Sequence, residues 1–256
     1  MITMTNKKQG IMELCKKKKY LFDYDGVLVP DITAEQLKRA YSTAECLLST
    51  RYNLPMADAI ALLRKLREEK FPGIREPLIA VMHREFPELS VPEVFNAVFG
   101  SYKNDERRFD YDKDLAIQLR DLYRGGIDSF VFTNNIEKEV ISSMQAKGIA
   151  QYFSDVIGCD HLNGVFKPSP EAFNLALKRM SSTTEEVVFV DNSAANVTAA
   201  VDMGIFSVYI TGDRLDTAEH VCANLIFATV TDFLKIGRYM LAANKFIRIP
   251  ISPLQE

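Results

Sequence analysis

The sequence of 256 residues predicts an α/β protein with a parallel sheet, helices on both faces of that sheet, and an inserted α-helical segment. Two observations lead to this expectation. Short apolar runs alternate with amphipathic segments along most of the chain, which is typical of strand–helix units in a parallel sheet. Residues 31–108 interrupt this alternation, because they contain helical patterns and no convincing strand.

The predicted strands are short apolar runs of the kind that a parallel sheet buries on both faces. They cover residues 20–22, 128–133 and 187–191, with weaker candidates at 155–158, 206–210 and 225–228. The helices between them carry apolar residues at helical spacing, and two of them end at glycine. They cover residues 114–124, 137–147 and 170–180, and a last helix that packs on the core is expected from Leu234 onward.

The insert is predicted to be entirely helical. Thr33 and Gln36 form a capping box at the start of its first helix. Later helices are expected over residues 56–70, 78–86 and 92–99. An insert directly after the first strand divides the chain into a discontinuous α/β core, residues 1–30 and 109–256, and a helical domain, residues 31–108.

The composition argues against several classes of function. A formal net charge of −3 gives no general attraction to a nucleic acid polymer or a membrane. The four cysteines lack the C-x-x-C spacing of zinc and redox sites. The first ten residues are polar, and no apolar run approaches the roughly 20 residues that span a bilayer. We therefore expect a cytoplasmic protein, with a monomer and a homodimer both open.

Two aspartates follow the first predicted strand. Asp23 and Asp25 stand at the carboxyl end of that strand, where parallel sheets bind ligands, and Gly26 lets the chain turn. Two carboxylates so close repel each other unless a cation lies between them or one is protonated. One carboxylate can attack phosphorus while its neighbour transfers protons, so the pair predicts phosphate chemistry. The ordinary alternative is an aspartate that caps a turn.

Polar residues also follow the later strands. Thr133 and Asn134 offer a hydroxyl and a backbone N–H to phosphate, and their alternative role is to cap the next helix. Lys167 can neutralise the phosphate and the nucleophile, although most lysines are solvated. Asp191 ends the third clear strand and can complete an oxygen cage for Mg²⁺. Four polar groups at four expected edges of one sheet point to a shared site.

The segments that carry these residues read FDYDGVL, VFTNN, VFKPSPEAF and VVFVDNSAANV. In this order, over about residues 20–210, they resemble the haloacid dehalogenase-like hydrolase superfamily, in its subfamily with an α-helical (C1) cap. The resemblance implies a Rossmann-like core with the first strand central, and a cap, residues 31–108, that closes over the site. It also implies a Mg²⁺-dependent phosphatase that acts on a small phosphorylated metabolite through an aspartyl-phosphate intermediate.

The resemblance implies a role for each residue of the first three motifs. Asp23 is the nucleophile and a metal ligand, and Asp25 is the general acid/base that offers its backbone carbonyl to the metal. Thr133 and the backbone of Asn134 bind phosphate. Lys167 binds phosphate and stabilises charge during catalysis.

The fourth motif departs from the superfamily pattern. Asp191 and Asn192 occupy the metal-binding positions, but the most regular acid of this motif falls at position 192. An amide oxygen can coordinate a hard cation but brings no charge. A non-catalytic or weakly active phospho-ligand-binding protein is therefore one alternative. A phosphomutase, which also keeps both acids of the first motif, is another, whereas dehalogenases lack the acid that Asp25 supplies.

The expected substrate rests on a narrower resemblance. Residues 148–153, followed by Cys159-Asp160, look similar to the pyrimidine 5′-nucleotidase-like branch, which favours a nucleoside 5′-monophosphate. Insert residues that are candidates for contact with its base or sugar are Tyr41, Arg51, Tyr52, Phe71 and Arg75. Packing is the more common role of helical aromatic residues.

Overall fold

The computed structural model describes residues 10, 13–14, 16–67, 69–71, 74–103, 105–162, 164–212 and 221–236. Only the first residues of the helix expected from Leu234 fall within these ranges, and Leu234 is buried there. The rest of that prediction lies outside the described residues. None of the described helices is long and apolar enough to cross a membrane.

The protein is built on a six-stranded sheet with the strand order β5-β4-β1-β6-β7-β8. Every neighbouring pair of strands in this sheet is parallel. The strands are β1 (Lys19–Phe22), β4 (Asp128–Phe132), β5 (Asp155–Ile157), β6 (Val187–Asp191), β7 (Phe206–Ile210) and β8 (Leu225–Phe227). All six predicted strands are present, and β1 lies in the interior between β4 and β6, so the predicted α/β fold class is confirmed.

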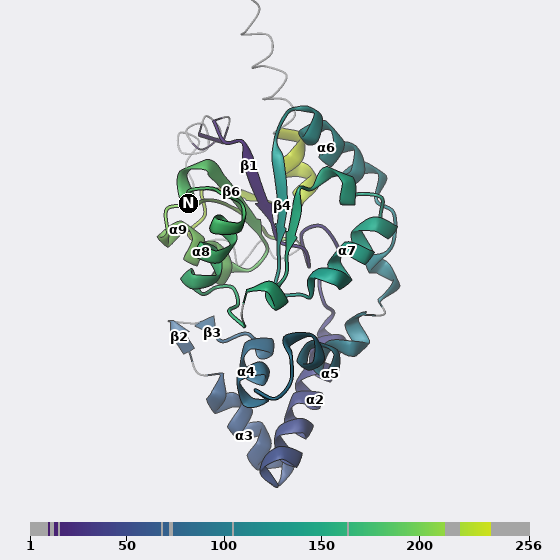
Figure 1. Cartoon of the computed structure of the whole chain (residues 1–256), viewed down its shortest axis with the longest axis vertical. Coiled ribbons are helices and arrows are strands. Elements are labelled where there is room, and N and C mark those ends of the chain that lie inside the picture. The colour runs from purple at the N-terminus through teal and green to yellow at the C-terminus, as the bar shows by residue number, and fades with distance from the viewer. Residues whose placement is uncertain are drawn as a thin grey trace, which may run out of the picture.

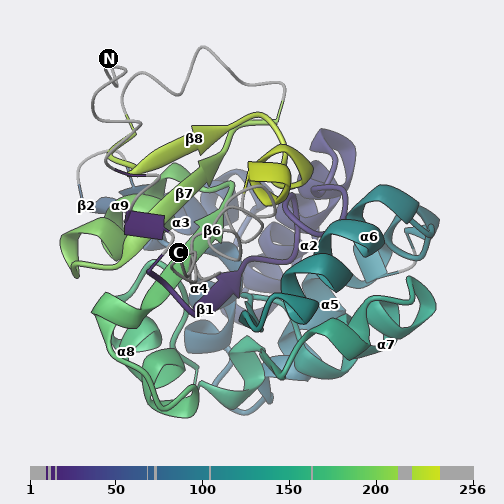
Figure 2. The same ribbon diagram turned by 90° about the horizontal axis from the view of Figure 1, so that it is seen from above.

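Helices cover both faces of the sheet (Figures 1 and 2). One face carries α6 (Lys113–Arg124) and α7 (Glu137–Ala146), and the other carries α8 (Pro170–Arg179) and α9 (Ala194–Asp202). Successive strand residues point to opposite layers: Phe22 packs with α6 and α7, whereas Leu21 packs with α8 and α9. Burial on both faces explains why the strands read as continuous apolar runs. Short 3₁₀ turns lie at Glu106–Arg108, Ala150–Tyr152, Cys159–His161 and Thr184–Glu186.

The insert follows β1 and contains four helices in its described part. They are α2 (Ala34–Tyr52), α3 (Met56–Leu66), α4 (Leu78–Glu85) and α5 (Val91–Lys103). The predicted capping box is present at α2: Thr33 accepts from the Gln36 N–H, and the Gln36 side chain accepts from the Thr33 N–H. Asn53 in the left-handed conformation closes α2 at its other end.

The insert is not entirely helical, which corrects the sequence-based expectation. β2 (Glu69–Phe71) and β3 (Ile74–Arg75) form a small antiparallel hairpin, and α3 ends at Leu66 rather than near residue 70. These strands are too short to show the alternation that marks a strand in a sequence. Their pairing with each other, rather than an apolar pattern, defines them.

The insert has its own apolar core, and that core continues into the α/β part of the chain. Ala44, Leu48, Met82 and other buried residues of α2–α5 form one cluster. Three residues from outside the insert belong to the same cluster: Ile136, Cys159 and Phe166. These three lie in the loops beyond β4, after β5 and before α8, so the insert packs against the carboxyl edge of the sheet (Figure 1). The boundaries of the two predicted domains stay a prediction.

Phe173 on α8 provides a test of the packing on one sheet face. Its ring is fully buried and meets Phe132 and Phe189 edge-on, with centroid separations of 5.3 and 5.1 Å. We expect Phe173→Ala to lower the free energy of unfolding by about 3–5 kcal/mol, because it removes the aromatic contacts and leaves a cavity. Urea denaturation measures the loss. Tyr111→Ala is the control, since that ring is 63% exposed; it should change the free energy by less than about 0.5 kcal/mol.

Candidate active site

The carboxyl ends of β1, β4 and β6 bring the predicted site residues to one edge of the sheet. Asp23 continues β1 by donating its N–H to the Val190 carbonyl at 2.8 Å. Thr133 continues β4 in the same way toward the Ile157 carbonyl, at 3.0 Å. Asp191 is the last residue of β6. The register of the parallel ladders therefore places these three residues next to one another.

Lys167 connects the three strand ends. Its ammonium group donates to Asp23 Oδ1 at 2.8 Å, to Asp191 Oδ2 at 2.9 Å and to the Phe132 carbonyl at 2.7 Å. The side chain is 1% exposed, which excludes the solvated lysine of the sequence-based alternative. Asn134 fixes its backbone from both sides: the amide nitrogen donates to the Lys167 carbonyl at 3.0 Å, and the amide oxygen accepts from the Lys167 N–H at 2.9 Å.

The charges around Lys167 do not balance. Two carboxylates share one buried ammonium group, so ionisation of both would leave an excess negative charge. Burial and the charge of Asp191 raise the pKa of Asp23 to about 8, although Lys167 opposes the shift. Burial alone would lower the pKa of Lys167, but the carboxylates of Asp191 and Asp23 raise it overall. Lys167 is thus held as a cation, and Asp23 ionises readily only if a further positive charge approaches.

Asp25 faces residues that sequence reasoning did not identify. Its Oδ1 accepts from the Tyr102 hydroxyl at 2.5 Å, and its Oδ2 accepts from the Asn135 amide at 3.1 Å. The Arg108 guanidinium lies 3.9 Å from Oδ1. Burial raises the pKa of Asp25, while Arg108 and the two hydrogen bonds act in the opposite direction. A carboxyl group with a raised pKa can hold a proton for transfer near neutral pH.

The site opens into a cavity of about 560 Å³. Six of the seven predicted site residues line it: Asp23, Asp25, Thr133, Asn134, Lys167 and Asn192. Its other lining residues are Asp31, Ser193, Ala194, Ala195, Asn196 and Tyr209. Thr133 accepts from the Asn135 N–H at 3.1 Å, within the turn before α7, but the helix itself is capped at Ile136 without a side-chain hydrogen bond, so Thr133 does not cap it.

Asp191 is the predicted residue that does not line the cavity. It is fully buried, and its carboxylate accepts from the Ser193 N–H at 2.7 Å, from the Asn196 amide at 3.0 Å and from Lys167. These partners turn it inward, toward the lysine. The geometry assigns it to holding Lys167, and its role as a metal ligand stays a prediction that the structure does not favour.

Asn192 takes the position on the cavity. Its amide nitrogen donates to Asp31 Oδ2 at 3.2 Å. It lies so close to Gly26 that a Cβ there would come within 1.9 Å of the amide nitrogen, and Gly26 also has a φ of +82°. The positive φ therefore favours glycine after the acid pair, and any side chain at this position would also displace the Asn192 amide.

The oxygen atoms around Asp23 fit a magnesium ion, as the resemblance of the four sequence motifs implies. Mg²⁺ prefers oxygen and is usually held by one or two carboxylates together with water and substrate phosphate. Asp23, the backbone carbonyl of Asp25 and the amide oxygen of Asn192 would be its protein ligands, and a cation there would favour the ionised form of Asp23 beside Asp191. Among the described residues, no three His, Cys, Asp or Glu side chains group as metal ligands, so water and phosphate would complete the shell.

Three insert residues expected to contact a base or sugar lie elsewhere. Arg51 pairs with Glu88, Tyr52 donates to Glu85 at 2.6 Å, and the Tyr41 ring carries the guanidinium of Arg67. None of the three lines the cavity. The side chains of Phe71 and Arg75 lie outside the described part of the structure.

Sequence reasoning missed four residues around the acids: Asp31, Tyr102, Arg108 and Asn135. For Asn135 a signal existed, since it directly follows the predicted phosphate-binding pair. Tyr102 and Arg108 are far from every motif in the chain, and only the path of the backbone brings them to Asp25.

Fold and site together define a Rossmann-like α/β protein with an acid pair, a buried lysine and a hydroxyl at the carboxyl edge of its sheet, beside a mainly helical insert. Residues 20–210 match the family described as haloacid dehalogenase-like hydrolase. Because this match spans most of the chain, the protein belongs to that family.

Curated relatives match a shorter stretch. The chain is 33% identical over 111 residues to a phosphoglycolate phosphatase of Vibrio cholerae, covering 41% of this chain and 49% of that protein. It is 30% identical over 125 residues to a phosphoglycolate phosphatase of Escherichia coli, covering 47% of this chain and 48% of that one. The chain thus matches about half the length of these relatives.

Solved structures support the fold over a longer range. An HAD phosphatase from Thermococcus onnurineus matches 86% of this chain and 97% of its own, with a TM-score of 0.53 and 22% identity. A predicted phosphoglycolate phosphatase from Haemophilus somnus matches 87% and 98%, with a TM-score of 0.54 and 22% identity. A dehalogenase matches 86% and 96%, with a TM-score of 0.55 and 15% identity. At these identities the likeness concerns the fold alone.

Lys167→Met tests the buried charge arrangement. Without the ammonium group, Asp23 and Asp191 would face each other unpaired, so we expect the free energy of unfolding at neutral pH to fall by about 3–5 kcal/mol. Chemical denaturation measures this change. Lys38→Met on the surface of α2 is the matched control and should have an effect below about 0.5 kcal/mol. Equal stability of the two variants would show that the buried pairs contribute nothing net.

Proposed function

We propose that the protein is a Mg²⁺-dependent phosphatase that hydrolyses a small phosphomonoester through an aspartyl-phosphate on Asp23. The observation that carries the proposal is the contact of Lys167 with Asp23 and Asp191 at the edge of a cavity that Thr133 and Asn134 also line. It supports a carboxylate oriented for attack next to a fixed positive charge, which is what phosphoryl transfer requires.

The chain's own residues divide the steps between them. Asp23 attacks phosphorus, and the bond from phosphorus to the leaving oxygen breaks. Asp25 gives a proton to that oxygen and then takes one from the water that attacks the phosphoaspartate, which releases phosphate and restores both acids. Thr133, Asn134 and Lys167 hold the phosphate oxygens. When bound by Asp23, Asp25 and Asn192, Mg²⁺ supplies charge neutralisation of the phosphate.

The proposed substrate is a small phosphorylated metabolite, met in the cytoplasm by a monomer or homodimer. Sequence resemblance favours a nucleoside 5′-monophosphate, whereas the names of the curated relatives favour 2-phosphoglycolate. Among the residues whose side chains the structure describes, Tyr209 is the one aromatic residue that lines the cavity, which supports a small substrate over a stacked base. Phosphate release from both compounds and from p-nitrophenyl phosphate, with and without Mg²⁺, distinguishes the classes.

A specific observation also favours a weakly active or non-catalytic phosphate-binding protein. Asn192 brings no charge to the expected metal, and the contacts of Asp191 with Lys167, Ser193 and Asn196 do not favour Asp191 as the ligand in its place. Stabilisation by Mg²⁺ with beryllofluoride, without turnover of any ester, would support this second function.

Asp23→Asn tests the nucleophile. We expect phosphate release to fall by at least about 10⁴-fold, because an amide does not attack phosphorus. The fold should persist, since Lys167 keeps its contacts with Asp191 and the Phe132 carbonyl. Circular dichroism checks the fold, and Asp202→Asn, at an exposed position on α9, is the control that should keep full activity. Undiminished turnover in Asp23→Asn would refute the mechanism.

Asn192→Asp tests the departure in the metal motif. The new carboxylate would face Asp31 at the position of the present hydrogen bond, so we expect lower thermal stability without metal. Added Mg²⁺ should bind at least about tenfold more tightly than in the native protein, a gain of about 1.4 kcal/mol. Titration calorimetry measures the affinity, and Asn53→Asp, at the far end of α2, is the control that should leave it unchanged. Equal Mg²⁺ affinity in Asn192→Asp would place the ion elsewhere.

A further inference from the structure

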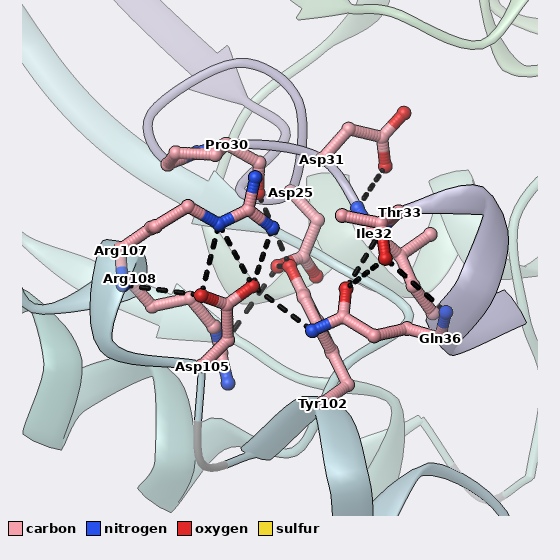
Figure 3. A network of polar contacts seen from close by, with 10 residues as sticks. All are labelled: Asp25, Pro30, Asp31, Ile32, Thr33, Gln36, Tyr102, Asp105, Arg107 and Arg108. Carbon is pink, nitrogen blue, oxygen red and sulfur yellow. Dashed lines mark hydrogen bonds and ion pairs between the residues drawn. The ribbon is translucent and has the colours of Figure 1, made fainter. Parts of the chain in front are cut away.

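The chain passes between the core and the insert twice, and the two passages lie side by side next to Asp25 (Figure 3). The outgoing passage is residues 30–33 and the returning passage is residues 102–103 and 105–108. Gln36 at the start of α2 donates to Asp105 Oδ2 at 3.0 Å, which ties the two together. We call these two segments the hinge.

Tyr102 brings the returning passage into contact with the acid. It is the penultimate residue of α5 and 4% exposed. Its hydroxyl lies 2.5 Å from Asp25 Oδ1 and 3.3 Å from the Pro30 carbonyl of the outgoing passage. One insert side chain therefore contacts both the catalytic acid of the core and the other half of the hinge.

Arg108 places a positive charge against the same carboxyl group. It is 1% exposed, and its guanidinium lies 4.6 Å from the Tyr102 ring centroid and 5.5 Å from the Tyr24 ring centroid. The guanidinium also lies 3.9 Å from Asp25 Oδ1. Its Nε and one terminal nitrogen have no hydrogen-bond partner among the described residues.

A buried guanidinium with unsatisfied donors is costly for folding. A leucine or methionine would fill the same space between two rings without that cost. Packing therefore does not explain why a charged residue stands at this position, and among the described residues Asp25 is the acid that Arg108 pairs with.

From these contacts we propose that Tyr102 and Arg108 are positioning residues for Asp25, so that the hinge holds the general acid in place for proton transfer to the leaving oxygen. The Tyr102 hydroxyl fixes the direction of the Asp25 carboxyl group. Arg108 holds a positive charge beside the same group. The inference rests on the proposed phosphatase function, and it adds that the acid is held by the returning passage of the insert. Proton transfer then depends on a docked insert, whereas nucleophilic attack by Asp23 does not.

The test compares two substrates that differ in their need for an acid. An alkyl phosphate leaves as an alkoxide and requires a proton, whereas p-nitrophenyl phosphate leaves as a stable phenolate that needs little help. General acid catalysis contributes roughly 10²–10⁴-fold, and Tyr102→Phe should remove part of it. We expect kcat/KM for the alkyl ester to fall about tenfold and that for p-nitrophenyl phosphate to fall less than about twofold.

Tyr52→Phe is the matched control. The Tyr52 hydroxyl also donates to a carboxylate, Glu85, at 2.6 Å, but on the insert surface and away from the cavity. It should leave the ratio of the two kcat/KM values unchanged. Tyr102→Phe keeps the ring that contacts Arg108, and thermal unfolding checks that it folds.

Arg108 gives a second, independent variant. Arg108→Gln should lower the alkyl-to-aryl ratio in the same direction, and Arg108→Lys, which keeps the charge, should restore part of it. If Tyr102→Phe does not fold, the test is decided by the alkyl-to-aryl ratio of kcat/KM in Arg108→Gln and Arg108→Lys. An equal loss on both substrates, or no loss on either, overturns the inference and leaves the phosphatase function standing. Absence of phosphate release by the native protein from either ester overturns both.

Discussion

One buried ammonium group holds the carboxyl edge of the sheet together. Lys167 reaches the end of β4 through the Phe132 carbonyl, the end of β1 through Asp23 and the end of β6 through Asp191. The sheet supplies the register that brings the three groups within reach, and Asn134 fixes the lysine backbone. Asp23 and Thr133 are consequently positioned by strand ends, and Lys167, which lies in the loop before α8, is held to them through Asn134.

Much of this site could be predicted from the sequence, because one rule connects it to the fold. Residues that follow parallel strands meet at one edge, so the ordered motifs containing Asp23, Thr133 and Lys167 were enough to expect a shared cavity. The direction of Asp191 could not be predicted in this way. As the last residue of β6 it points toward the buried lysine, and its neighbour Asn192 faces the cavity instead.

Other features have no local signal at all. Tyr102 and Arg108 reach Asp25 only because the insert leaves and re-enters the core beside the same loop. The hairpin of β2 and β3 is defined by pairing between two very short segments. Neither segment is long enough for its hydrophobic periodicity to predict a strand. In both cases the determining contacts join positions that are distant in sequence or lack an apolar pattern.

The apolar cluster shared by insert and core has a consequence for access to the cavity. Ile136 lies just after Asn135 and Phe166 just before Lys167, yet both are buried among side chains of the insert. Any movement of the insert that widens the entrance must expose these side chains to water, at roughly 25 cal/mol per Å² of uncovered apolar surface. The same contacts therefore hold the insert to the core and limit the entry of substrate. A substitution that weakens them should affect both.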